Sequence, residues 1–265
     1  MLGSALQETS PVVLGAVASL LAGLATGLGA IPILMTVRVS AKMQDALLGF
    51  GAGVMLSASF FSLILPALEA AQAEGAGRSL AATIVVLGIL IGAGTLAILN
   101  RVIPHEHFFT GREGRDTRVL ARIWLFVIAI TLHNFPEGLA VGVGFGGGNV
   151  ENGTALAIGI GLQNLPEGLA VAVALLTQHY SRGYAFAVAF ATGLVEPVGG
   201  LLGAGVVTLA RDLLPWGMAF AAGAMIFVIS SEIIPETHRR GFQHAGTTGL
   251  MIGMVLMLYL DVILG

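Results

Sequence analysis

The stretch LHNFPEGLAVGV (132–143) returns thirty residues later as LQNLPEGLAVAV (162–173). Nine of the twelve aligned positions are identical, and each copy lies near the middle of a long apolar run. Adjacent membrane-crossing runs are antiparallel, so we expect the two copies to meet at the same depth with opposite polarity. The duplication predicts a site built from two related helices.

The surrounding composition is that of a membrane protein. The 265 residues are 56% hydrophobic and only 10% charged, with 38 glycines and a mean hydropathy of +0.91. Soluble domains carry about 25% charged residues, and a soluble chain of this length could not bury so much apolar surface. The net charge of −3 argues against nucleic-acid binding. The absence of cysteine excludes disulfides, thiolate metal sites and a cysteine nucleophile.

Apolar runs long enough to cross the hydrocarbon core as helices predict eight transmembrane helices in a single domain spanning residues 1–265. The runs are continuous rather than alternating, which favours helices over a barrel. The first run is not preceded by Lys or Arg and is long enough to span, so we expect a first span rather than a cleaved signal. The predicted spans lie near residues 12–36, 46–68, 80–99, 121–145, 153–177, 184–209, 214–235 and 246–264.

Basic residues are strongly biased to one side of these spans. Ten of the 12 Lys and Arg residues fall in the loops after spans 1, 3, 5 and 7. The positive-inside rule therefore predicts a multi-pass protein of the plasma membrane, the inner membrane in a bacterium, with both termini outside or periplasmic. The cytoplasmic loop 100–120 contains His105 and His107. Because imidazole is a common metal ligand, we expect metal release beside them.

Weaker repeats flank the central pair. The tetrapeptide ATGL at 25–28 returns at 191–194, and FGAGVM at 50–55 resembles FAAGAM at 220–225. Spans 1 and 2 thus resemble spans 6 and 7 in the opposite orientation. Inverted repeats with proline-interrupted helices and a midplane site are typical of secondary transporters.

Four glutamates are predicted inside the spans, and no Lys or Arg lies near the middle of a span to neutralise them. An ionised side chain at the centre of a span costs about 2.5–3.5 kcal/mol. The carboxylates must therefore be protonated, face water or bind a cation. The four are Glu137, Glu167, Glu196 and Glu232.

Residue spacing favours the cation. His133 and Glu137 are separated by four residues, so both lie on one face of span 4, and span 5 repeats this geometry. An imidazole with carboxylate and amide oxygens suits Zn²⁺, Fe²⁺, Mn²⁺ and related ions. The remaining candidate ligands are Met55, Asn134, Gln163, Asn164, Glu167 and Glu196.

These residues resemble the ZIP (Zrt/Irt-like) family of divalent metal transporters, and in particular its GufA-like bacterial branch. The matching motifs are HNFPEG (133–138), QNLPEG (163–168), EP (196–197), PHEH (104–107) and SEIIPETH (231–238). The resemblance covers essentially the whole chain.

The resemblance implies an all-α protein with eight spans in a 3+2+3 inverted-repeat arrangement, a homodimer, and an elevator-type movement that carries metal into the cytoplasm. It also implies a paired metal centre in which Glu137 and Glu167 bridge two sites. One site would add Met55, His133 and Gln163, and the other would add Asn134, Asn164 and Glu196.

The sequence departs from the common family pattern at two positions. Many relatives have histidine where this chain has Gln163, and some carry a charge where it has Asn164. Both differences weaken the expected site and leave the preferred metal open.

We expect a transporter rather than an enzyme, with Zn²⁺ as the first substrate, Cd²⁺, Fe²⁺ or Mn²⁺ as alternatives, and no organic cofactor. Two other functions stay open. One is an intramembrane metallohydrolase with Glu137 as general base, and the other is a passive cation channel of the same architecture. Glu232 either assists metal release, takes up a proton or only bonds to a neighbouring helix.

Overall fold

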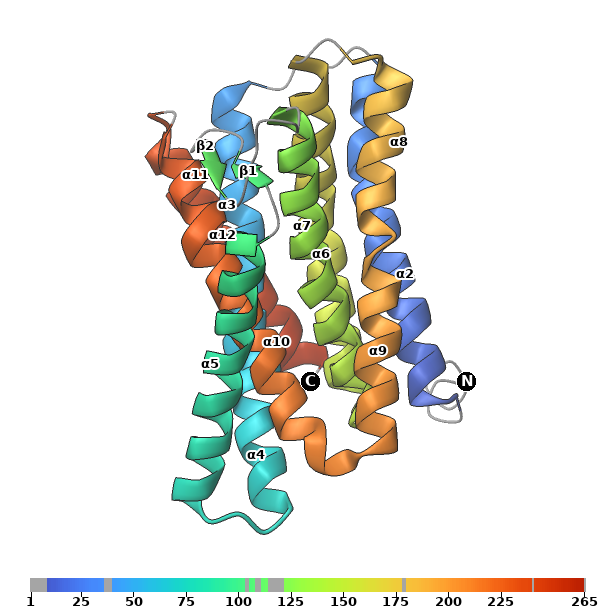
Figure 1. Cartoon of the computed structure of the whole chain (residues 1–265), viewed down its shortest axis with the longest axis vertical. Helices are drawn as coiled ribbons and strands as arrows, with labels where there is room; N and C mark the ends of the chain where they lie inside the picture. Colours follow the sequence, from blue (N-terminus) through green and yellow to red (C-terminus); the bar gives the residue numbers. More distant parts are fainter. Residues whose placement is uncertain are drawn as a thin grey trace.

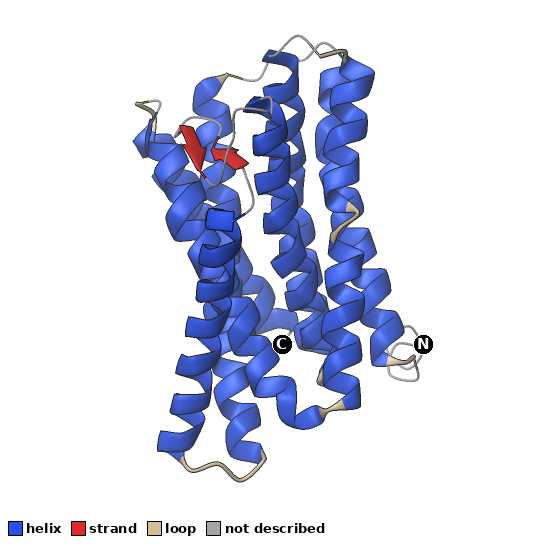
Figure 2. Cartoon of the chain, in the orientation of Figure 1, coloured by secondary structure: helices blue, strands red, loops and turns tan. Residues whose placement is uncertain are grey.

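The computed structural model describes residues 9–35, 40–102, 105–107, 111–113, 122–177, 180–239 and 241–264. Helices make up almost all of this part of the chain (Figure 2). A short antiparallel pair, β1 (His105–His107) with β2 (Gly111–Glu113), lies between the third and fourth long helices. The predicted all-α membrane protein is therefore confirmed.

The long helices are interrupted by short 3-10 and π-helical turns. The 3-10 turns are η1 (Ile31–Met35) and η4 (Arg211–Leu213), and the π-helical turns are η2 (Ala58–Ile64) and η5 (Ile229–Ile233). The α-helices are α2 (Pro11–Ala30), α3 (Ala41–Ser57), α4 (Leu65–Ala73), α5 (Arg78–Val102), α6 (Arg122–Gly146), α7 (Val150–Thr177), α8 (Arg182–Gly193), α9 (Glu196–Leu209), α10 (Leu214–Val228), α11 (Ile234–Arg239) and α12 (Gln243–Leu264).

Seven helical segments within the described residues are long and apolar enough to cross a membrane. They coincide with seven of the eight predicted spans. The predicted span over 121–145 corresponds to α6, a helix of 25 residues that is not among the seven. The count of eight therefore stays a prediction.

The helices form two groups that lie side by side (Figure 1). In the first, which we call the site-bearing group, α2 packs on α6, α7, α8 and α9, and α6 packs on α9. In the second, the support group, α3 packs on α12 and α5 packs on α10, together with α4 and α11. Contacts of α7 with α3 and of α6 with α10 join the two groups.

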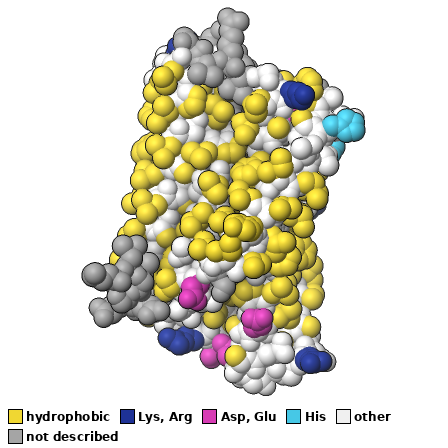
Figure 3. Space-filling model, turned by 180° about the vertical axis from the view of Figure 1, so that it is seen from behind, with side chains coloured by type: hydrophobic (Ala, Val, Ile, Leu, Met, Phe, Trp, Pro, Cys, Tyr) yellow, Lys and Arg dark blue, Asp and Glu magenta, His cyan; other side chains and the backbone are white. Residues whose placement is uncertain are grey.

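The surface is that of a membrane-embedded bundle. On the face seen in Figure 3, hydrophobic side chains cover the middle of the molecule and charged side chains gather toward its two ends. Helices α5 and α12 expose large apolar side chains along their lengths, such as Leu90 and Val262. Both chain ends lie toward the same half of the molecule (Figure 1).

Glycines set how closely the helices approach. At Gly92 on α5, an added Cβ would overlap the backbone carbonyl of Phe220 on α10. At Gly94, two residues later, nothing lies within 4 Å of the same position. Small residues allow membrane helices to approach until their backbones touch, which increases van der Waals contact. The α5–α10 contact thus depends on Gly92 and not on Gly94.

This contrast predicts that Gly92→Ala destabilises the protein, because α5 and α10 would have to separate. Gly94→Ala is the matched control on the same helix, where the methyl group meets open space. Thermal unfolding of the purified proteins in detergent measures the difference. Equal melting temperatures for the two variants would contradict the assignment of this contact.

Candidate metal centre

The glycine of each repeated Pro-Glu-Gly motif brings its helix against a partner helix. Gly138 on α6 lies against the backbone of Glu196 on α9, and Gly168 on α7 lies against the backbone of Thr26 on α2. In each case a Cβ would overlap a carbonyl oxygen. The residue before each glycine is a glutamate, so the same contacts position Glu137 and Glu167 inside the site-bearing group.

Three glutamates lie within electrostatic reach of one another there. Glu137 and Glu196 are 0% exposed and Glu167 is 7% exposed. Glu167 lies within electrostatic reach of Glu137, of Glu196 and of His133. Glu196 is the first residue of α9, where the free backbone N–H groups of a helix start favour a negative charge. The break between α8 and α9 therefore serves to place one of the three carboxylates.

Two neighbouring amides link these carboxylates to the backbone. The Nε2 of Gln163 donates to the Oδ1 of Asn164 at 2.6 Å. The Nδ2 of Asn164 donates to the Oε1 of Glu196 at 2.7 Å and to the carbonyl of Ala22 at 2.8 Å. Gln163 also lies beside both Glu137 and Glu167. These amides connect α7 with α9 and α2 across the site.

His133 is held from the other side, by the support group. Its Nε2 lies 2.6 Å from the Oε2 of Glu232 in the π-helical turn η5. The Nδ2 of Asn100, near the end of α5, donates to the other oxygen of Glu232 at 2.9 Å. Glu232 therefore bonds to neighbouring helices, and its roles in metal release or proton uptake stay predictions.

Met55 is buried on α3 in the same apolar cluster as Ala22 and Ile160. Gly51, one turn earlier on α3, lies against the side chain of Gln163. Since residues four apart share a helix face, Met55 lies on the face that α3 turns toward α7.

Several buried polar atoms in this cluster reach no hydrogen bond among the described residues. Burying a polar or charged atom without a partner is costly, so a partner of another kind is expected. No three His, Asp or Glu side chains of the described chain are grouped closely enough to form a metal site by themselves. The amide oxygens are therefore needed to complete one. The atoms are Nδ2 and Oδ1 of Asn134, both carboxylate oxygens of Glu137, Oε1 of Glu167 and Oε2 of Glu196.

Six of the eight predicted ligands are near one another through these contacts, whereas Asn134 on α6 and Met55 on α3 are buried without a described contact to the other six. That the eight form one metal centre stays a prediction. The predicted release residues are placed less completely. Glu232 adjoins His133, and the backbone of His105 and His107 forms β1, whereas their side chains lie outside the described part.

A second polar contact between helices was not predicted from the sequence. In η2 the Oγ of Ser62 donates to the Oδ1 of Asp261 on α12 at 2.6 Å, and the Nδ2 of Asn152 on α7 donates to the Ser62 carbonyl at 3.0 Å. Ser62 follows Met55 by seven residues, as Glu232 follows Met225. The π-helical turns η2 and η5 therefore make contacts at equivalent positions of the two repeats. The alignment of FGAGVM with FAAGAM in the sequence indicates this equivalence.

The Asn164 contacts predict a stability effect. Asn164→Leu keeps the shape of the side chain but removes its two donated hydrogen bonds. An unpaired buried polar group costs about 1–3 kcal/mol, so the variant should unfold at a lower temperature. Thr83→Val is the control, because the Thr83 hydroxyl is exposed and bonds only within its own helix. Unfolding of Asn164→Leu at the temperature of Thr83→Val would show that the Asn164 bonds do not stabilise the fold.

Comparison with known proteins agrees with this architecture. The model of the family described as "ZIP Zinc transporter" matches residues 104–261. The chain is 50% identical over 251 residues to "Zinc transporter GufA" of Myxococcus xanthus, covering 95% of this chain and 99% of that protein. It is 47% identical over 257 residues to "Zinc transporter ZIPB" of Bordetella bronchiseptica, covering 91% and 78%. It is also 32% identical over 305 residues to "Zinc transporter ZIP11" of Homo sapiens, covering 84% and 89%. The chain belongs to the ZIP family.

Proposed function

We propose that this protein imports divalent transition-metal ions into the cytoplasm, with Zn²⁺ as the main substrate and Cd²⁺, Fe²⁺ and Mn²⁺ as alternatives. The observation that carries the proposal is the set of buried carboxylate and amide oxygens without hydrogen-bond partners between α6, α7 and α9. The names of the relatives, all zinc transporters, support the same substrate.

Electrostatics explains why the cluster suits a cation. Each ionised side chain at the centre of a span costs about 2.5–3.5 kcal/mol, and no Lys or Arg lies near the middle of a span to offset that cost. A divalent ion carries the charge needed to compensate two carboxylates at once. The transported ion thus compensates the buried carboxylates, and its release exposes the protein again to the free-energy cost of burying them. Such a site is expected to bind its ion with moderate affinity and to release it.

We propose that the donors form the two sites that the family resemblance implies. Glu137 and Glu167 would contribute to both sites as bridges. Met55, His133 and Gln163 complete one site. The other is completed by Asn134, Asn164 and Glu196. Nitrogen and oxygen donors with one thioether suit Zn²⁺ and its neighbours better than Na⁺ or Ca²⁺.

His133 links the metal centre to Glu232, the first residue of the proposed release path. In the conformation described here its Nε2 pairs with Glu232, so metal binding must compete with Glu232 for this nitrogen. An ion that leaves Glu137 and Glu167 meets Glu232 next, and we propose that it then passes to His105 or His107. Asn100 orients Glu232 for this step through its hydrogen bond.

The two groups of helices support an elevator-type movement. Every carboxylate and amide candidate at the centre lies on the site-bearing group, whereas Met55 and Glu232 lie on the support group. Displacement of one group past the other would carry the bridging glutamates as a unit and change only the partners from the support group. We further propose a homodimer in the bacterial inner membrane, with both termini periplasmic.

Zinc uptake into proteoliposomes tests this function. We expect saturable uptake by the wild-type protein, reported by a trapped zinc-sensitive dye. Uptake should fall to the level of empty vesicles in Glu137→Ala and in Glu167→Ala, because each variant removes a bridging carboxylate. Asp212→Asn, an exposed carboxylate in η4, is the matched control and should transport like the wild type.

The outcomes separate the alternatives. Undiminished uptake in both glutamate variants would contradict the assigned site. Flux that rises without saturation would indicate a channel rather than a carrier. If none of the four metals enters under any imposed gradient, the transport proposal fails and the metallohydrolase becomes the leading alternative.

A further inference from the structure

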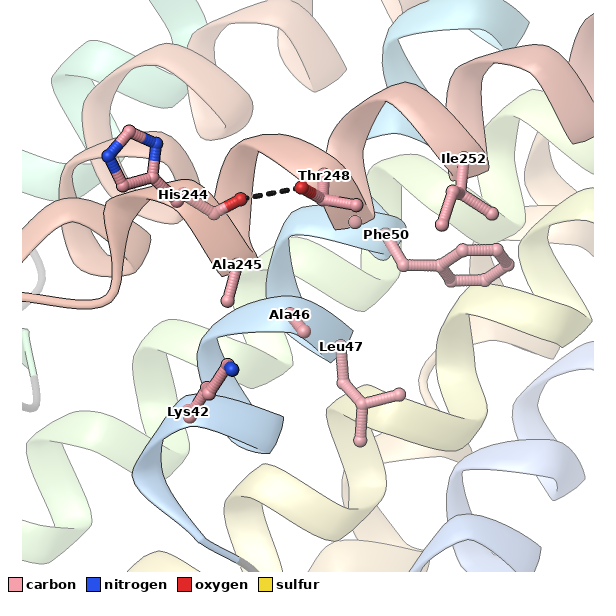
Figure 4. A pocket seen from close by; sticks show the side chains of 9 residues that line it. Lys42, Ala46, Leu47, Phe50, His244, Ala245, Thr248 and Ile252 are labelled. Atoms are coloured by element: carbon pink, nitrogen blue, oxygen red, sulfur yellow. Dashed lines mark hydrogen bonds between the residues drawn. The ribbon is translucent and has the colours of Figure 1, made fainter.

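A groove of about 500 Å³ lies between α3 and α12, away from the metal centre (Figure 4). Both helices begin at this end of the bundle, at Ala41 and Gln243. We call it the α3–α12 groove. Its outer end is formed by Lys42 and His244, and its inner walls by Leu47, Phe50 and Ile252.

The groove exists because the two helices touch along small residues. An added Cβ at Gly249 would overlap the carbonyl of Ala46, and one at Gly49 would overlap the carbonyl of Gly246. The floor of the groove is therefore made of small side chains such as Ala46 and Ala245. The larger side chains stand on either side and leave a trough that runs along the helices.

The groove is polarised along its length. Figure 4 shows Lys42 and His244 at one end and Phe50 and Ile252 at the other. Lys42 and Phe50 are eight residues apart on α3, and His244 and Ile252 are eight residues apart on α12. Each separation corresponds to about 12 Å at 1.5 Å per residue. Lys42 and His244 are exposed, and no salt bridge among the described residues involves Lys42. The starts of both helices add partial positive charge at the same end.

This arrangement matches an anionic phospholipid. A phosphate needs a cationic partner at headgroup level, and an acyl chain needs an apolar trough that starts there and runs toward the bilayer centre. Exposed apolar side chains are sequence neighbours of the groove-lining residues, such as Met43 next to Lys42 and Met251 next to Ile252, as expected of a surface that faces lipid. A divalent metal ion would be repelled by Lys42, so the groove is not part of the metal path.

A second copy of the chain fits this groove poorly. In a two-fold dimer within a membrane the same patch meets itself at the same depth. The Lys42 of one copy would then face the Lys42 of the other, and like charges repel.

We propose that the α3–α12 groove binds one anionic phospholipid, with its phosphate between Lys42 and His244 and one acyl chain along Leu47, Phe50 and Ile252. The site is independent of the transported metal. On the predicted orientation it faces the cytoplasmic leaflet, where a basic residue near the surface contributes about 1 kcal/mol to the binding of anionic lipid, equivalent to ~5-fold in affinity.

Native mass spectrometry of the full-length protein tests the proposal, with phosphatidylglycerol compared against phosphatidylcholine. We expect the wild type to retain one more phosphatidylglycerol than phosphatidylcholine. Lys42→Ala should weaken this retention by ~5-fold, and Lys42→Arg should preserve it. Arg101→Ala is the matched control, because Arg101 is an exposed cation near the end of α5 that does not line the groove.

A second variant tests the apolar part of the site. Ala245→Leu fills the floor of the groove without changing its charge, and it should also reduce phosphatidylglycerol retention. Equal retention of the two lipids by the wild type would overturn the proposal. So would unchanged retention in both Lys42→Ala and Ala245→Leu. Dissociation of a dimer by these same variants would show instead that a second copy covers the groove.

Discussion

This protein is built around the burial of three carboxylates inside a membrane helix bundle, where no Lys or Arg lies near the middle of the spans to offset them. Glu137 and Glu196 are fully buried, and Glu167 nearly so. Desolvating them lowers the stability of the fold unless a cation compensates. The surrounding amides of Asn164 and Gln163 satisfy only some of the carboxylate oxygens. A site of this kind is unfavourable when empty, which is suited to a carrier that must release its ion.

Close helix packing is what holds such a site together. The backbone contacts at Gly138 and Gly168 tie α6 to α9 and α7 to α2, so the site-bearing group is joined by van der Waals contact rather than by charge. The support group is joined in the same way through Gly92 and Gly249. Between the groups the polar contacts include His133 with Glu232 and Asn152 with Ser62. These polar bonds add to the helix packing of α7 on α3 and of α6 on α10 that joins the two groups.

The sequence predicted the helical membrane fold, the packed central pair and the depth of the glutamates, because hydropathy and the duplicated motif report burial and periodicity directly. It did not predict the partner of His133. The bond to Glu232 depends on π-helical turns, which widen the helix by one residue and have no reliable residue signature. Asn100 and Asn152 were missed for a similar reason. Each lies near a helix end, where an asparagine is ordinarily read as a cap or a surface residue.

Thermal unfolding with and without Zn²⁺ tests the central claim most directly. Zinc should raise the melting temperature of the chelator-treated wild type, since about 2.7 kcal/mol of stabilisation accompanies a ligand at 100 times its Kd. The double variant Glu137→Gln/Glu167→Gln should be at least as stable as the wild type without zinc, because two buried charges are removed, and should not respond to zinc. A zinc response retained in full by this variant, or a variant much less stable than the zinc-free wild type, would contradict the account.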